Sequence, residues 1–93
     1  MRCFFHIAGA IRDVDDAGVE IATIGEARLM AARYLSEVLK DQPDSIWLGD
    51  EVRVEVTDID NLVLFTVISF GVDAPATAAQ PRSFRPPDVE PGT

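Results

Sequence analysis

Residues 23–43 read TIGEARLMAARYLSEVLKDQP, and this stretch decides the fold because it specifies one amphipathic helix. Thr23 and Glu26 have the spacing of a capping box, in which the threonine oxygen accepts the N–H of the residue three positions on. Pro43 ends the helix, since proline cannot continue it. Apolar side chains recur every three or four residues and predict the buried face: Ala27, Met30, Ala31, Tyr34, Leu35, Val38 and Leu39.

A β-hairpin is predicted after this helix. Residues 51–57, EVRVEVT, alternate strictly between polar and apolar side chains, which is typical of a strand with one buried face. Asp58 and Asn61 favour a turn, because aspartate caps its own backbone and asparagine tolerates a left-handed conformation. The strand that returns, residues 62–70, is apolar on both faces.

The turn length sets which face of the returning strand meets the helix. With a three-residue turn that closes onto a bulge, Val56 opposes Leu64 and Val52 opposes Ile68. Val63, Phe65 and Val67 then lie beside Arg53, Glu55 and Thr57, on the face away from the helix. A shorter loop reverses this assignment, and the sequence leaves both open.

The amino-terminal part predicts a second hairpin, with strands at residues 3–8 and 19–22 joined by an acidic loop. The complete order is strand, strand, helix, strand, strand. We therefore expect an α+β fold in residues 1–72: a ββαββ two-layer sandwich with one helix on one face of a mostly antiparallel four-stranded sheet. Residues 73–93 contain five of the six prolines and predict a disordered Pro/Ala-rich tail.

Net charge, the length of apolar runs and the cysteine count exclude several classes of function. The net charge of −8 repels phosphate backbones, so we expect no direct binding of nucleic acid. No apolar run approaches the length of about 20 residues that spans a bilayer, so we expect no membrane contact. A single cysteine forms no intrachain disulfide and indicates a reducing cytoplasm.

No catalytic, cofactor-binding or metal-binding residues are predicted, and no small-molecule substrate is evident. His6 is the one side chain that titrates near neutrality, but Cys3 lies three residues away in the same strand and therefore points to the opposite face. Residues 13–18 resemble the start of a calcium loop and fail where Ala17 and Ile24 replace ligand side chains. We interpret them as an acidic turn and expect that the protein is not an enzyme.

An interaction surface is the functional prediction that remains. One helix covers one side of the sheet, whereas the first and last strands carry apolar groups on both sides. We expect the helix-free face to be covered by a second copy, as a homodimer, by a protein partner, or by the tail folding back through Phe84, in that order. The predicted interface residues are Phe4, His6, Val63, Phe65 and Val67.

Three segments carry a resemblance to a known family: Arg2-Cys3-Phe4-Phe5-His6, residues 15–20 (DDAGVE) and residues 54–58 (VEVTD). They resemble a family of short bacterial domains of unknown function, well represented in rhizobia and other alphaproteobacteria. The resemblance covers residues 1–70 and implies a bacterial cytoplasmic protein of the ββαββ kind, with no activity to transfer. Asn61 stands where the family usually has glycine, and Ala8 where it commonly has aspartate.

The order of elements also resembles the amino-terminal domain of HicB-type antitoxins. That resemblance implies an alternative function, in which this acidic protein neutralises a basic RNase-like toxin. The sequence lacks the proline-glycine-cysteine stretch before the helix that is diagnostic of HicB.

Overall fold

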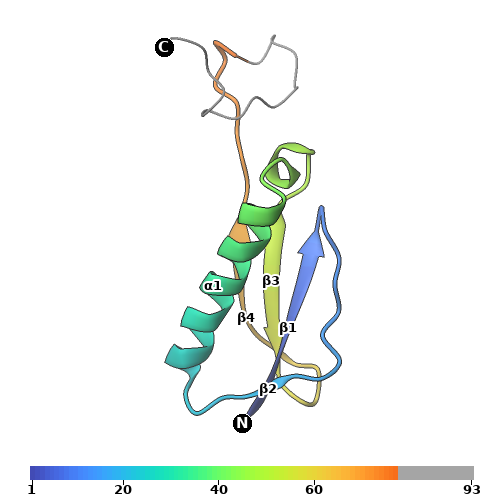
Figure 1. The fold of residues 1–93 in the computed structure, drawn as a ribbon, viewed down its shortest axis with the longest axis vertical. Helices are drawn as coiled ribbons and strands as arrows, with labels where there is room; N and C mark the ends of the chain where they lie inside the picture. Colours follow the sequence, from blue (N-terminus) through green and yellow to red (C-terminus); the bar gives the residue numbers. More distant parts are fainter. Residues whose placement is uncertain (78–93) are drawn as a thin grey trace.

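The computed structural model describes residues 1–77 and shows one helix packed on a four-stranded antiparallel sheet (Figure 1). The sheet order is β2-β1-β3-β4. This arrangement confirms the predicted α+β class and the ββαββ order. The elements are β1 (Arg2–Gly9), β2 (Val19–Glu20), α1 (Ile24–Asp41), the short 3-10 helix η1 (Ser45–Trp47), β3 (Val52–Thr57) and β4 (Val63–Ser69).

The predicted boundary at residue 72 and the tail of residues 73–93 stay predictions. Most of that segment, residues 78–93, lies outside the described part of the chain.

Helix α1 begins as the capping pattern predicts. The Thr23 side chain accepts a hydrogen bond from the Glu26 N–H at 3.1 Å. The helix ends at Asp41, and the N–H of Gln42 still donates to the Val38 carbonyl. The predicted apolar face is confirmed, because Ala27, Ala31, Leu35 and Val38 are buried and Met30, Tyr34 and Leu39 pack partly against the core.

The core lies between α1 and one face of the sheet. Strict alternation in β1 buries Cys3, Phe5 and Ile7, and alternation in β3 buries Val52, Val54 and Val56. Phe5 lies opposite Val56, and Ile7 lies opposite Val54. Central sheet positions and α1 therefore enclose a single apolar cluster.

The sequence leaves two face assignments open for the last hairpin, and the structure has the reversed one, although the turn is as expected. Asn61 has a φ of 65°, and the Asp58 carboxylate accepts the N–H groups of Asp60 and Leu62 at 2.9 and 3.0 Å. Thr57 lies opposite Val63.

A β-bulge then shifts the register by one residue. Val56 opposes Phe65 rather than Leu64, Val54 opposes Val67, and Val52 opposes Ser69 rather than Ile68. A one-residue shift exchanges the two faces of a strand. Phe65 and Val67 therefore lie on the helix side and pack against the core.

Helix α1 does not cover the whole sheet. It lies mainly over β3 and β4, and in Figure 1 β1 lies to one side of the helix. The helix-side surface of β1 is consequently bordered by α1 on one side and by residues 10–18 on the other.

Candidate functional site

Residues 10–18, which we call the acidic loop, run back along the free edge of β1. Asp13 and Ile7 exchange two backbone hydrogen bonds of 2.9 and 3.0 Å, and Cys3 pairs with Val19 in β2. The N–H of Phe5, which lies between these pairs, donates to the Asp15 carboxylate at 3.1 Å. The loop thus acts as an irregular strand that closes this edge of the sheet.

Asp15 fastens the acidic loop to β1. One carboxylate oxygen accepts the N–H groups of Ala17 and Gly18 at 3.0 Å each, and the other accepts the Phe5 N–H. Burial alone raises the pKa of a carboxyl group. In Asp15 the three amide donors and the nearby His6 outweigh burial, and the pKa lies below its ordinary value.

Gly18 is required where the loop joins β2. Its φ is +75°, and a Cβ at this position would lie 2.8 Å from the Phe4 ring. A side chain here is excluded both by backbone conformation and by space. The spacing of Asp15 and Gly18 is therefore a structural signature of this turn.

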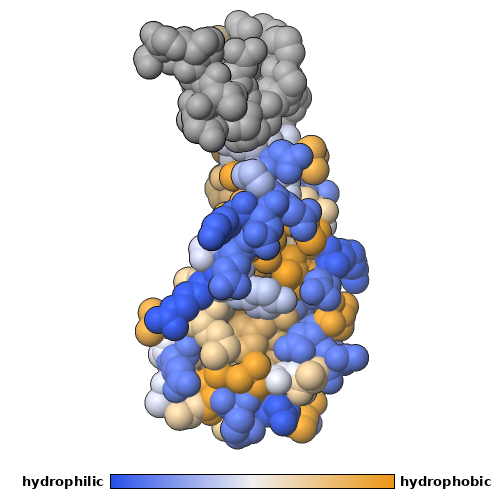
Figure 2. Space-filling model, in the orientation of Figure 1, coloured by the Kyte–Doolittle hydropathy of each residue, from blue (hydrophilic) through white to orange (hydrophobic). Residues whose placement is uncertain are grey.

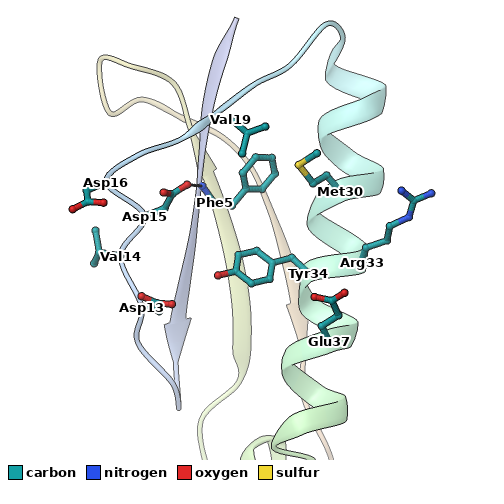
Figure 3. A pocket seen from close by; sticks show the side chains of 10 residues that line it. All are labelled: Phe5, Asp13, Val14, Asp15, Asp16, Val19, Met30, Arg33, Tyr34 and Glu37. Carbon is teal, nitrogen blue, oxygen red and sulfur yellow. Dashed lines mark hydrogen bonds between the residues drawn. The ribbon is translucent and has the colours of Figure 1, made fainter.

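A groove lies between the acidic loop and α1, with a volume of about 460 Å³. Figure 2 shows it from the helix side as a hydrophobic hollow between two hydrophilic borders. Phe5, Met30 and Tyr34 converge on its centre, Phe5 from β1 and the other two from α1 (Figure 3). The remaining lining residues are Asp13, Val14, Asp15, Asp16, Val19, Arg33 and Glu37.

The groove has a negative electrostatic character. Four of its lining residues are carboxylates, and the one cation, Arg33, points away from Tyr34 on the outer side of α1 (Figure 3). Burial first, and then the charges of Asp13, Asp15 and Glu37, raise the pKa of the Tyr34 hydroxyl. Charges that disfavour a phenolate favour a cation at the same place.

The helix-free face of the sheet carries His6, which was the one candidate for acid–base chemistry. Its Nδ1 accepts the N–H of Asp15 at 3.1 Å, and its Nε2 lies 3.0 Å from the Thr57 hydroxyl. A backbone N–H only donates, so Nδ1 carries no proton and Nε2–H donates to Thr57. Phe4 stacks on His6 with ring centroids 6.5 Å apart. These contacts give the imidazole a structural role that links β1, β3 and the acidic loop.

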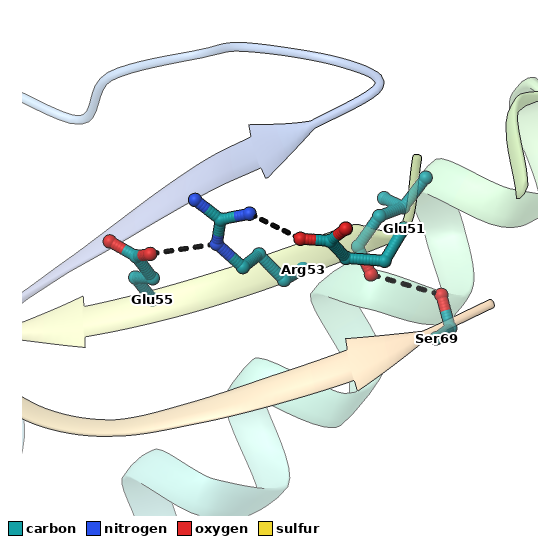
Figure 4. A network of polar contacts seen from close by, with 5 residues as sticks. Glu51, Arg53, Glu55 and Ser69 are labelled. Carbon is teal, nitrogen blue, oxygen red and sulfur yellow. Dashed lines mark hydrogen bonds and ion pairs between the residues drawn. The ribbon is translucent and has the colours of Figure 1, made fainter. Parts of the chain in front are cut away.

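The helix-free face is not the continuous apolar surface that the sequence predicts. Arg53, the second residue of β3, pairs with Glu55 at 2.7 Å and with Glu51 at 2.5 Å (Figure 4). Thr66 of β4 lies opposite Glu55 on the same face. Charged and hydroxyl side chains thus occupy the middle of this face.

The five predicted interface residues do not share one surface. Phe4 and His6 are half-buried on the helix-free face, and Val63 lies opposite Thr57 with 52% of its area exposed. Phe65 and Val67 are on the other side of the sheet because of the bulge. Whether Phe4, His6 and Val63 contact a partner stays a prediction.

Cys3 is on the opposite face from His6, as predicted from their spacing, and is fully buried. Burial, followed by the influence of Glu20 and Asp58, raises the pKa of its thiol against the opposing effect of the N-terminal ammonium. Within residues 1–77 no three His, Cys, Asp or Glu side chains are grouped so that they could hold a metal ion. The described part of the chain also contains no helix with the length and apolarity to cross a membrane.

The fold and groove define a small α+β domain with a concave surface between α1 and the acidic loop. Residues 2–71 match the model of the family described as Domain of unknown function (DUF6894), and the chain belongs to that family. This confirms the predicted membership of a family of domains of unknown function. No curated protein and no solved structure matches the chain.

Sequence reasoning missed the groove and the role of Asp15. The sequence predicts an acidic turn at residues 13–18 and places Tyr34 and Met30 on the buried face of the helix. The signal that was available is the pair Asp15 and Gly18, because an aspartate three residues before a glycine is typical of a side-chain-capped turn. A capped turn next to β1 brings a loop wall close to the helix.

Proposed function

We propose that this domain is a non-enzymatic protein-interaction module that binds a basic segment of a partner protein in the groove between the acidic loop and α1. An apolar side chain of the partner packs on Phe5, Met30 and Tyr34. Lysine or arginine side chains on either side of it pair with the carboxylates of the rim. The observation that carries this proposal is that one groove combines an apolar floor (Phe5, Met30 and Tyr34) with an acidic rim. The rim carboxylates are Asp13, Asp15, Asp16 and Glu37.

The groove suits a side chain rather than a flat surface. Its volume of about 460 Å³ is within the range of ligand sites, and apolar floors with a few placed polar groups are typical of such sites. Within residues 1–77 the Tyr34 hydroxyl has no hydrogen-bond partner, so it is available to a bound segment. Aromatic residues with a polar end are enriched at interfaces for this reason.

The helix-free face supports this role less well. Docking there would place Arg53, Glu51 and Glu55 under a partner, and burying charges is costly unless each finds a new partner. We therefore assign docking to the groove and not to the sheet face that the sequence predicts.

The experiment measures binding of a fluorescein-labelled peptide of alternating arginine and leucine by fluorescence anisotropy. The double variant Asp13→Asn, Glu37→Gln removes two groove carboxylates whose side chains make no hydrogen bond within residues 1–77. Exposed ion pairs contribute about 0.2–1 kcal/mol each, so the dissociation constant should rise by about twofold to thirtyfold. Added salt should weaken binding to the wild type more than to the variant.

A matched control separates the groove from the overall charge. Asp41→Asn, Asp60→Asn changes the net charge by the same amount at exposed positions away from the groove. Equal weakening by both double variants would show that binding follows net charge alone and would refute the groove as the site. A Met30→Lys variant, which places a cation on the floor, should abolish binding while the circular dichroism spectrum is retained.

An antitoxin of the HicB kind is the second candidate, because the net charge of −8 and the acidic groove both suit a basic toxin. Co-expression with the product of a small basic gene adjacent to its own gene tests this role. Rescue of growth by the wild type and not by the Asp13→Asn, Glu37→Gln variant would support it.

We also propose a cytoplasmic location and no direct contact with nucleic acid, membrane or small-molecule substrate. The supporting observations are the buried reduced thiol of Cys3 and the net charge of −8. Fractionation of cells that express the full chain tests the location.

A further inference from the structure

The two edges of the sheet differ in how their backbone groups are satisfied. On the β1 side, Asp13, Asp15 and the two-residue strand β2 take up the outward groups of β1. On the other side, β4 has β3 as its only neighbour in the described sheet. The sheet thus has one closed edge and one open edge.

The hydrogen-bond pattern fixes which groups of β4 face outward. Ile7 directs its N–H and C=O away from β3, since it exchanges both with Asp13. Groups alternate sides along an antiparallel ladder, so Val54, opposite Ile7, bonds to Val67 of β4. The neighbours of Val67, which are Thr66 and Ile68, therefore direct their N–H and C=O groups away from the sheet.

The side chains of β4 include none of the usual features that keep an edge strand from pairing with another chain. Natural edge strands are usually protected by lysine, proline, inward charges or a covering loop. Residues 62–72, LVLFTVISFGV, contain no charged residue and no proline. Ile68 and Phe70 are 55% and 67% exposed. In a chain with a net charge of −8, this uncharged run is a surface where two copies approach without direct repulsion.

We infer that β4 is a self-association edge on which a second copy of this chain adds its own β4 in antiparallel orientation. A strand that pairs antiparallel with itself is related to its copy by a two-fold axis, and each outward donor then meets an outward acceptor. The two four-stranded sheets become one continuous sheet. Exposed Ile68 side chains of the two copies meet near the axis and are withdrawn from water.

This dimer leaves the groove open, because the groove lies beside β1 at the opposite side of the sheet. The inference is therefore independent of the proposed function. A dimer carries two grooves, and a failure of either proposal leaves the other standing.

The experiment measures the mass of the full chain by light scattering after size exclusion, at loading concentrations up to about 100 µM, since dimer population depends on protomer concentration. We expect a dimer for the wild type and at least a tenfold increase of the dimer dissociation constant for Ile68→Lys. The matched control is Leu29→Lys, which changes a similarly exposed residue of α1 in the same way. It should leave the dimer intact.

A second variant and a second measurement address the backbone directly. Thr66→Pro removes one outward N–H without removing a bond to β3, and should also give a monomer with an unchanged circular dichroism spectrum. Hydrogen exchange of the Thr66 and Ile68 amides should slow as the concentration of the wild type rises.

Three results would overturn the inference. They are a monomeric wild type at the highest concentration, equal effects of Ile68→Lys and Leu29→Lys, and slow amide exchange at Thr66 that is independent of concentration. The last result would show that the edge is covered within one chain.

Discussion

Replacing Asp15 by alanine tests whether this side chain fastens the acidic loop to the sheet. The change removes the acceptor for the N–H groups of Phe5 and Gly18, which are partly buried, and of Ala17, which is exposed. A hydrogen bond to a charged group contributes about 1.5–3 kcal/mol when it is shielded from water and less when it is not. Because this carboxylate is partly solvated, we expect a loss of about 2 kcal/mol.

Urea and thermal unfolding followed by circular dichroism measure this loss. For a domain of this size, about 2 kcal/mol lowers the melting temperature by roughly 8–16 °C. The matched control is Asp16→Ala, which removes the neighbouring exposed carboxylate and should change stability by less than about 0.5 kcal/mol. Asp15→Asn should fall between them, because one of its two side-chain positions becomes a donor facing an amide N–H.

The pH dependence gives an independent check with a defined sign. The native pKa of Asp15 is below its ordinary value, so its contribution to stability is present at neutral pH and is lost as the pH falls through the native pKa. The difference in stability between wild type and Asp15→Asn should therefore shrink below about pH 4. Equal losses for Asp15→Ala and Asp16→Ala, or a difference that is constant down to pH 2, would refute this reasoning.

Three further predictions follow from the same structure. Leu35→Ala should cost about 2–5 kcal/mol in chemical unfolding, because Leu35 is buried in the core, whereas Arg28→Ala on the solvent side of α1 should cost less than about 0.5 kcal/mol; equal losses would mean that the helix face is misassigned. Gly9→Ala should be strongly destabilising in thermal unfolding, since Gly9 has a φ of +95° and a Cβ there would lie 2.0 Å from the Glu51 carbonyl oxygen; a variant as stable as the wild type would contradict this geometry. Long-range ¹H–¹⁵N NMR at neutral pH should find His6 with its proton on Nε2, because its Nδ1 accepts a backbone N–H; a proton on Nδ1 would contradict that hydrogen bond.

The sequence contains local signals that predict most of this fold. Thr23 and the apolar spacing predict the helix, alternation predicts β3, and Asp58 with Asn61 predicts the turn that follows, because each pattern acts over a few residues. The faces of β4 could not be predicted in the same way. Its turn has the expected geometry, but the bulge after Val63 moves Phe65 to the helix side, and a bulge has no sequence signature among apolar residues.

The groove could not be predicted because it depends on a long-range relation. Tyr34 and Met30 have the spacing of core residues, but they are only partly buried, because α1 lies mainly over β3 and β4. Where a helix lies across a sheet is decided by the fit of many side chains at once. Phe65 and Val67 lie on the helix side and not on the predicted helix-free face because of the bulge.

Because α1 lies to one side of the sheet, the residues of the buried core and the residues that line the groove are largely different. The buried cluster is enclosed by α1, β1 and β3. One wall of the groove is the acidic loop, and no residue of this loop belongs to the buried core. Loop walls tolerate substitution far better than packed interiors. Substitutions in residues 10–18 that keep Asp15 and Gly18 should therefore change the lining of the groove and leave the buried cluster intact.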